Sequence, residues 1–444
     1  METKPILNMR SMNWSGIVVL IYVLFNIQHC TKNPEPEYTV DITVRDYAYN
    51  TVFVGETIRV GILSYLNLSP ELLFGPVPYY PDDPVTWSSS NSAIATVTKR
   101  TDTSAVIYGK TSGKVTITAE CGESLSSVQF RVFRKTEQIL TSGDGTRDYP
   151  CWSADGTQIA YSKDGQIYLI DAVSSTGYTE IPLTPTIYYA SYPCWSPDGA
   201  RICFSGTTDR TSGATYLYIV DVASGSLTKL TSLSGNHHPG WSPDGSTIAF
   251  SHSAAVCTIP AVGGSEVTLT SSKGSLGYLI NPQWSSDGLR IAYSYEDAVY
   301  IVDIASQNEQ KIIENGSGEY GDRENAQWSD DGTSIVYKHD SRYIKHIPTT
   351  GGAEYTTVYS STLINIPTVS TANGYIVFSD YYGDLLAVNI DGSDLFRVNN
   401  GVTDIFDASQ AYNHPEWSPD GSKIVFVRYT NSLTSQIGII GCTP

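Results

Sequence analysis

The sequence predicts an all-β protein whose larger part is a β-propeller of seven blades, with six blades as the alternative. Gly, Ser, Thr and β-branched residues are abundant, with 31 Tyr and only 16% charged residues, and this composition favours strands and tight turns over helices. From residue 152 onward, a motif that begins with Trp in six of its seven copies recurs every 41 to 48 residues, which is the period of a four-stranded blade. The 444 residues are too many for one ordinary core, so we expect more than one domain.

Residues 1–30 are predicted to be an export leader. Lys4 and Arg10 form a basic start, and residues 16–25 are an uninterrupted apolar run, which has the length of a signal-peptide core and is short for a transmembrane helix. Cys30, which follows this run, resembles the lipidation site of bacterial lipoproteins. An ordinary cleaved signal peptide and an uncleaved anchor are the alternatives. Each version places the folded part in the periplasm or at the cell surface, with membrane contact through this anchor only.

Residues 31–37 are predicted to be a polar tether stiffened by Pro, and residues 38–135 a small β domain. This domain resembles the group 2 family of bacterial immunoglobulin-like domains. The resemblance lies in Val-Gly-Glu-Thr at 54–57, Thr-Trp-Ser-Ser-Ser-Asn at 86–91 and Gly-Lys-Val-Thr-Ile at 113–117. It implies a β-sandwich with Trp87 between the sheets, and a spacer or adhesion role without catalysis.

The repeat motif reads Trp-Ser-x-Asp-Gly in six copies, which begin at Trp152, Trp195, Trp241, Trp284, Trp328 and Trp417. A decayed seventh copy begins at Val369 and is identified by its continuation, Ile-Val-Phe-Ser at 376–379. Ser-Pro-Asp-Gly is the signature of a type I turn, and strands before and after each turn supply the four strands of a blade. The Asp residues of these turns are expected to serve the turns rather than Ca²⁺.

The repeats are expected to close into a ring across residues 136–444. Residues 136–141 are a lone copy of the fourth strand, and the last repeat stops at its third strand. The early strand would therefore complete the last blade and remove the exposed edges. This part of the chain resembles the TolB-type, WD-like propeller family, which implies an envelope protein that binds partners on a propeller face. The role of TolB in the Tol–Pal system does not carry over, because the N-terminal domain is of another kind.

Charge and motifs exclude several function classes. The net charge of −18 disfavours a groove that follows phosphates, so no nucleic acid is expected. The sequence has no Gly-x-Ser-x-Gly elbow, so a serine peptidase is not expected. Six Cys follow Cys30, without a Cys-x-x-Cys pair; this spacing favours buried free thiols over disulfides and disfavours a metal cluster. Cys151 and Cys194 each precede a repeat Trp and are expected to be neighbours.

The candidate binding residues are those just before the Pro-x-Trp core of each repeat, because these would gather at one mouth of the channel. In chain order they are Tyr149, Tyr192, His238, Asn281, Asn325, Ile366 and His414. Two His, two Asn and two Tyr on one rim suit a sugar or a polar peptide. The alternative is that His-Pro and Tyr-Pro are only a way to enter the inner strand. Similar propellers occur in oligogalacturonate lyases, which hold a metal at the channel, although a typical metal site has three convergent ligands.

The sequence therefore predicts a non-catalytic binding or scaffold protein of the cell envelope, with a propeller that contacts other envelope proteins. No cofactor and no metal are expected. One alternative is a carbohydrate-binding protein of a glycan-utilisation system, with a polysaccharide as its partner. The other is a metal-dependent polysaccharide lyase.

Overall fold

The computed structural model describes residues 38–44, 51–53, 57–66, 77–78, 84–101, 104–121, 124–133, 136–174, 177–271, 281–295, 298–313, 323–360, 364, 367–370, 372–380, 383–399, 412–431 and 434–442. Every regular element in these ranges is a β-strand, which confirms the all-β prediction. No helix within them is long and apolar enough to cross a membrane. The predicted leader with Cys30 and the predicted tether lie outside the described residues.

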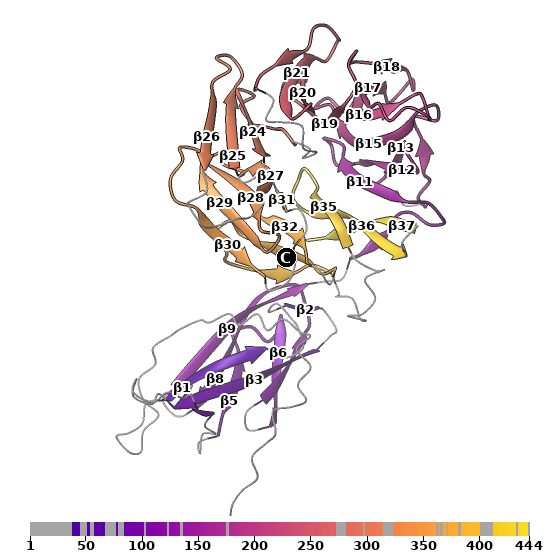
Figure 1. Ribbon diagram of the computed structural model, residues 1–444. Coiled ribbons are helices and arrows are strands. Elements are labelled where there is room, and N and C mark those ends of the chain that lie inside the picture. The colour runs from indigo at the N-terminus through magenta and orange to yellow at the C-terminus, as the bar shows by residue number, and fades with distance from the viewer. Residues whose placement is uncertain are drawn as a thin grey trace, which may run out of the picture.

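The N-terminal domain consists of two sheets around one core, below the propeller in Figure 1. Buried side chains of both sheets, such as Ile107 and Phe130, form that core, and the half-buried Trp87 packs against it. The resemblance to immunoglobulin-like domains stays a prediction. The first sheet has the order β1 (Tyr38–Val44), β3 (Thr57–Leu66), β7 (Ser104–Gly109) and β6 (Ala95–Thr101), with β4 (Val77–Pro78) beside β3; the second has the order β2 (Thr51–Phe53), β9 (Ser124–Phe133), β8 (Gly113–Cys121) and β5 (Thr86–Ser89).

Seven four-stranded antiparallel sheets follow within the described residues, and Figure 1 shows them arranged around a central axis, which confirms the propeller. We number these blades 1 to 7 in chain order. Blade 1 has β11 (Arg147–Trp152), β12 (Gln158–Lys163), β13 (Gln166–Asp171) and β14 (Ile181–Pro182); blade 2 has β15 (Tyr188–Trp195), β16 (Arg201–Thr207), β17 (Tyr216–Asp221) and β18 (Leu227–Lys229); blade 3 has β19 (Asn236–Trp241), β20 (Thr247–His252), β21 (Ala255–Pro260) and β22 (Val267–Thr268). Blade 4 has β23 (Gln283–Trp284), β24 (Arg290–Tyr295), β25 (Ala298–Asp303) and β26 (Glu309–Ile313); blade 5 has β27 (Arg323–Trp328), β28 (Ser334–His339), β29 (Tyr343–Pro348) and β30 (Tyr355–Tyr359); blade 6 has β31 (Thr368–Val369), β32 (Ile376–Ser379), β33 (Leu385–Val388) and β34 (Phe396–Arg397); blade 7 has β35 (Tyr412–Trp417), β36 (Lys423–Asn431), β37 (Thr434–Gly441) and the early strand β10 (Gln138–Ile139).

Each pair of consecutive blades shares a hydrophobic core. The second strand of every blade carries Ile, a smaller residue and then an aromatic residue, so the large side chains lie on one face and the smaller one on the other. In blade 2, Ile202 and Phe204 pack against Ala160 of blade 1. The same arrangement recurs around the ring, and between blades 7 and 1 it joins Val425 to Tyr161. Burial of apolar surface on both faces of every blade therefore holds the ring together.

The repeat Trp ties the inner strand of blades 1 to 5 to the preceding blade. The indole N–H of Trp284 donates a 3.0 Å hydrogen bond to the backbone oxygen of Gly240, and Trp152, Trp195, Trp241 and Trp328 make the equivalent bond. This contact supplies a hydrogen-bond donor to a backbone carbonyl of the preceding inner strand.

Blade 6, the decayed repeat, makes this connection by another route. Val369 has no indole, and the side chain of Gln327 in blade 5 bridges the two inner strands instead. Its Oε1 accepts from the Val369 N–H at 2.9 Å, and its Nε2 donates to the Pro367 oxygen at 3.2 Å.

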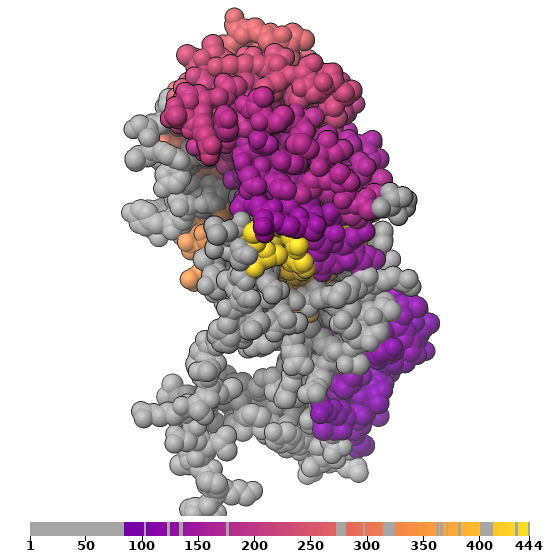
Figure 2. Space-filling model, turned by 90° about the vertical axis from the view of Figure 1, so that its right-hand side faces the viewer, coloured from indigo at the N-terminus to yellow at the C-terminus, as the bar shows by residue number. Residues whose placement is uncertain are grey.

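The ring closes where blade 7 meets blade 1, a contact that we call the closure seam. Strand β10 pairs with β37, with Gln138 opposite Ile439, and Figure 2 shows the C-terminal residues in yellow against the purple residues of blade 1. The fourth strand of the last blade is thus supplied from the start of the propeller, as the repeat pattern indicates.

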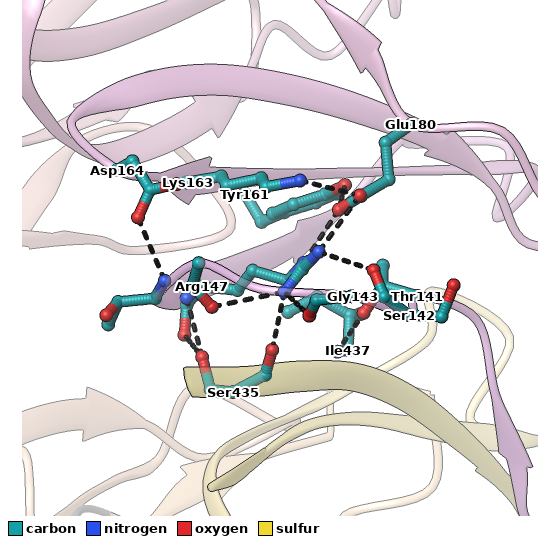
Figure 3. A network of polar contacts seen from close by, with 12 residues as sticks. Thr141, Ser142, Gly143, Arg147, Tyr161, Lys163, Asp164, Glu180, Ser435 and Ile437 are labelled. Carbon is teal, nitrogen blue, oxygen red and sulfur yellow. Dashed lines mark hydrogen bonds and ion pairs between the residues drawn. The ribbon is translucent and has the colours of Figure 1, made fainter. Parts of the chain in front are cut away.

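Arg147 is the centre of the closure seam (Figure 3). This side chain is fully buried. Its Nη1 donates to the backbone oxygen of Ser435 at 2.7 Å, and its Nε and Nη2 donate to the two carboxylate oxygens of Glu180 at 2.7 and 2.9 Å. Burial alone raises the pKa of Glu180, but hydrogen bonds from Arg147, Lys163 and Tyr161 lower that pKa to about 2. The ion pair is therefore charged at neutral pH.

A second ion pair joins the N-terminal domain to blade 6. The buried Arg131 guanidinium contacts the Asp394 carboxylate and lies 4.3 Å from the centre of the Phe396 ring. Lys114 donates to the same carboxylate at 2.8 Å, and the Tyr375 hydroxyl also donates to it. The blade whose repeat motif has decayed therefore contributes an ion pair to the N-terminal domain.

Replacing Arg147 with Ala is expected to lower the free energy of unfolding by about 3 kcal/mol, because it leaves the half-buried Glu180 and the carbonyl oxygens of the seam without their main donor. Thermal and denaturant unfolding measure this loss. The matched control is Arg210→Ala, because Arg210 is exposed and should change stability by less than about 0.5 kcal/mol. Equal stability of the two variants would contradict the role of the seam.

Asp394→Asn is expected to loosen the connection between the two domains, because Arg131 then lies buried without a counter-ion. Limited proteolysis should cleave the chain between Phe133 and Thr136 several times faster than in the wild type. Asp391→Asn changes an exposed residue of the same turn and should leave the rate unchanged. Unaltered cleavage of the Asp394 variant would show that the ion pair does not fix the domains.

Candidate binding site at the mouth of the propeller channel

Six of the seven predicted rim residues are described, and Ile366 lies outside the described residues. Four of the six form a continuous arc of rings, which we call the aromatic arc: His414, Tyr149, Tyr192 and His238. The ring centres are 4.9 Å apart from His414 to Tyr149, 4.3 Å from Tyr149 to Tyr192 and 4.0 Å from Tyr192 to His238. Residues from blades 7, 1, 2 and 3 therefore meet at one mouth of the channel.

The other two described rim residues form an amide chain. Asn281 Nδ2 donates to Asn325 Oδ1 at 2.9 Å, and Asn325 Nδ2 donates to the Pro367 oxygen at 2.9 Å. Gln283 Nε2 donates to Asn281 Oδ1 at 3.0 Å. The rim thus has an aromatic side, made by four of the predicted rim residues, and an amide side, made by two others together with Gln283.

A repeated β-bulge places these side chains. The pairing of the first two strands shifts register at the rim residue of blades 1, 2, 3, 5 and 7. The rim residue there has a φ between 46° and 56° in each of these five blades. That left-handed conformation costs about 1–3 kcal/mol for a residue other than Gly, and a bulge re-aims the side chain that it carries. Because Asn325 adopts it before Ala326, the conformation does not depend on a following Pro.

Both imidazoles of the arc are neutral at neutral pH. Burial, and to a lesser extent the neighbouring His237, lower the pKa of His238 to about 4. Burial also lowers the pKa of His414, against the opposing effect of Asp148. His414 keeps 32% of its side chain accessible, but protein atoms crowd the ring on the remaining sides. Burial raises the pKa of Tyr149 as well, so its phenol is uncharged.

Asp148 adds a carboxylate to the rim that the sequence analysis missed. Its Oδ1 accepts a 2.7 Å hydrogen bond from the Tyr429 hydroxyl and lies 3.6 Å from Nε2 of His414. Its position just before Tyr149 was a possible signal, but the partner Tyr429 comes from β36, far along the chain. Only the folded ring shows that the carboxylate belongs to the mouth.

A second layer of residues lies one step deeper, at the position before each repeat Trp. Burial raises the pKa of Glu416 to about 8, although an N–H of Trp152 lowers it in part. Cys151 is close enough to Glu416 and Cys194 for both to raise the pKa of its thiol, after the larger effect of burial, so the predicted neighbours Cys151 and Cys194 do lie near each other. All six Cys after Cys30 are free thiols.

The described residues do not fit a metal ion at this mouth. Two Tyr rings separate His238 from His414 in the arc, and within the described part of the chain no three His, Cys, Asp or Glu side chains are placed to share an ion. Among the described residues, cavities at two other places can be named. One, of about 330 Å³, lies between the motif turns of blades 1 and 2, and the other, of about 450 Å³, lies at the closure seam beside Gln138 and Lys423.

Comparisons with known proteins support the propeller. Residues 135–297 match the family model of the TolB beta propeller domain, and no curated protein is similar enough in sequence to match. Among solved structures, an oligogalacturonate lyase in complex with manganese is similar, with a TM-score of 0.54 and 13% identity over 81% of this chain and 97% of that chain. At this identity the likeness concerns the fold alone.

Glu416→Gln is expected to stabilise the protein at alkaline pH. The folded-state pKa of Glu416 is about 8 and its ordinary value is 4.5. Between pH 4.5 and pH 8 this carboxyl is therefore charged in the unfolded chain and protonated in the folded protein. The free energy of unfolding of the wild type falls as the pH rises through this range, because the unfolded chain binds fewer protons. The variant should melt with the wild type near pH 4.5 and several degrees higher near pH 8. The exposed Glu120→Gln should follow the wild type throughout, and equal melting of all three proteins at pH 8 would contradict the burial of a protonated carboxyl.

Proposed function

We propose that this protein, which carries a TolB-type β-propeller domain, is a non-catalytic binding protein of the cell envelope whose channel mouth receives a segment of a partner protein. The observation that carries the proposal is the rim. Six side chains from separate repeats converge at one mouth, and five of them hold a costly backbone conformation there. Domains of this family are typical of periplasmic and envelope proteins, which supports the location.

The chemistry of the rim suits recognition. The Tyr149 phenol and the two imidazoles of the aromatic arc are uncharged at neutral pH, and aromatic side chains contribute much of the binding energy at protein interfaces. The amides and Asp148 add hydrogen-bonding groups beside the rings. A partner segment would lay apolar or π surface on the arc and place polar groups toward these residues.

The N-terminal part of the chain would present this mouth. The proposal includes a leader at residues 1–30, anchored through lipidated Cys30 or an uncleaved apolar run, a tether at 31–37 and an immunoglobulin-like domain at 38–135. The ion pair between Arg131 and Asp394 supports a fixed placement of that domain on the propeller. Membrane contact would then be confined to the anchor.

Carbohydrate binding is the second candidate, favoured by the same aromatic faces next to a carboxylate and amides, which suit the two kinds of surface on a sugar ring. A metal-dependent polysaccharide lyase has support from the fold likeness only, because the rim residues do not fit a metal ion.

Affinity capture from envelope extract tests the proposal. The full chain is compared with a rim variant that carries Tyr192→Asn and His238→Asn. Asn suits these positions, because Asn325 adopts the same left-handed backbone in blade 5 and the substitutions should leave the fold intact. We expect a partner protein, identified by mass spectrometry, that the wild type retains and the rim variant binds at least about tenfold more weakly.

The control variant is Asp171→Asn, an exposed change of the outer part of blade 1, which should capture the same partner as the wild type. A partner retained equally by all three proteins would place the interface elsewhere. Retention of an oligosaccharide by the wild type alone, without a partner protein, would favour the second candidate.

A further inference from the structure

The aromatic arc and Asp148 together have the composition of a site for a cation. Four rings pack against one another, two pairs tilted and one pair edge to face, with centres 4.0 to 4.9 Å apart. The face of an aromatic ring attracts a cation that lies within about 6 Å of its centre. Asp148 stands at the His414 end of the arc, 3.6 Å from that imidazole. A guest in contact with Tyr149 therefore meets both π surface and a carboxylate.

We propose that the mouth takes a basic side chain, Lys or Arg, from the segment of the partner protein, with the alkyl and charged parts on the aromatic arc and the charge toward Asp148. This inference rests on the proposed function and specifies the chemistry of its partner.

The Asp148 carboxylate is oriented for such a guest. Within the described part of the chain, Tyr429 and His414 both approach this carboxylate at Oδ1. The hydroxyl of Tyr429 restricts the rotation of the carboxylate, so Oδ2 keeps one direction. Such pre-orientation reduces the entropy that binding would otherwise cost.

The basic residues closest in the sequence are engaged elsewhere. Arg147, which precedes Asp148, is fully buried in the closure seam and pairs with Glu180. Arg428, which precedes Tyr429, donates to Gln436 at 2.7 Å and to Glu137 at 3.4 Å. The imidazoles of the arc remain neutral because burial lowers their pKa. The carboxylate of Asp148 thus has no permanent cation from its own strand neighbours.

The whole chain favours the same sign of guest. Its net charge of −18 attracts basic segments over a distance and repels acidic ones. An acidic guest, such as a uronate or an Asp-rich segment, would approach the Asp148 carboxylate against this field. The mouth should therefore discriminate by charge before any contact forms.

Panning of a displayed library of random linear peptides against the full chain tests this inference. Peptides eluted from the wild type are counter-selected on Asp148→Asn and resynthesised with each Arg replaced by citrulline or each Lys by norleucine. We expect enriched peptides to share a basic residue. Its neutral replacement, or Asp148→Asn in the protein, should weaken binding at least about tenfold, and added salt should weaken the wild-type complex.

Matched variants keep the result interpretable. Asp171→Asn removes the same charge far from the rim and should bind like the wild type, and the melting temperature of Asp148→Asn should equal that of the wild type. Tyr149→Asn, which preserves the left-handed backbone, should lose binding as Asp148→Asn does.

The two proposals fail in different ways. Peptides that depend on Tyr149 and Tyr192 but carry no basic residue would overturn the cation site and leave the proposed function standing. If neither peptides nor envelope proteins bind in a rim-dependent way, both proposals fail, and rim-dependent binding of neutral oligosaccharides in that case would establish the second candidate.

Discussion

Each blade of this propeller covers its two apolar faces with its two neighbours, so the whole fold depends on the contact that joins the last blade to the first. That contact combines three components. The first is a hydrophobic core like that of every other blade interface, and the second is strand β10, which comes from the start of the propeller and pairs with the last blade. The third is the Arg147 network, in which a fully buried guanidinium bridges Glu180 and the backbone of Ser435. The burial of an Arg is acceptable here because Glu180 and several carbonyl oxygens satisfy its donors.

The candidate site inherits this dependence. The aromatic arc runs from His414 of blade 7 to Tyr149 of blade 1, and Asp148 is held by Tyr429 across the same boundary. The mouth therefore exists in this form only when the ring is closed. The β-bulge with its left-handed rim residue, repeated in five blades, turns the rim side chain to the channel while the rest of the inner strand stays in the sheet. The backbone specifies where the side chain is presented and leaves its type open, which is why Tyr, His and Asn occupy equivalent positions.

Much of this was predictable because a repeat converts sequence register into spatial register. The all-β class follows from composition and the repeat period, and the closing strand follows from the lone copy at residues 136–141. The positions of the rim residues follow from counting back from each repeat Trp, since equivalent residues of a propeller lie at equivalent radii. The remaining features depend on contacts that no local pattern encodes. Asp148 and Tyr429 are 281 residues apart, Arg131 and Asp394 are 263 apart, and Gln327 replaces the missing indole of blade 6 from another repeat. The burial that shifts the pKa of Glu416 is likewise a property of the assembled ring.

Strand β10 also determines when the fold can be completed during synthesis of the chain. Thr141, at the start of the propeller, bonds to Ile437, which is made 296 residues later. Throughout translation of the intervening blades, β10 has no partner and blade 1 keeps one apolar face uncovered. A chain that stops early lacks both the strand that shields this edge and the wall of the mouth that blade 7 supplies. Such a fragment exposes an edge strand of the kind that aggregates and has half a binding site, so completion of the chain, closure of the fold and acquisition of the site coincide in a single step.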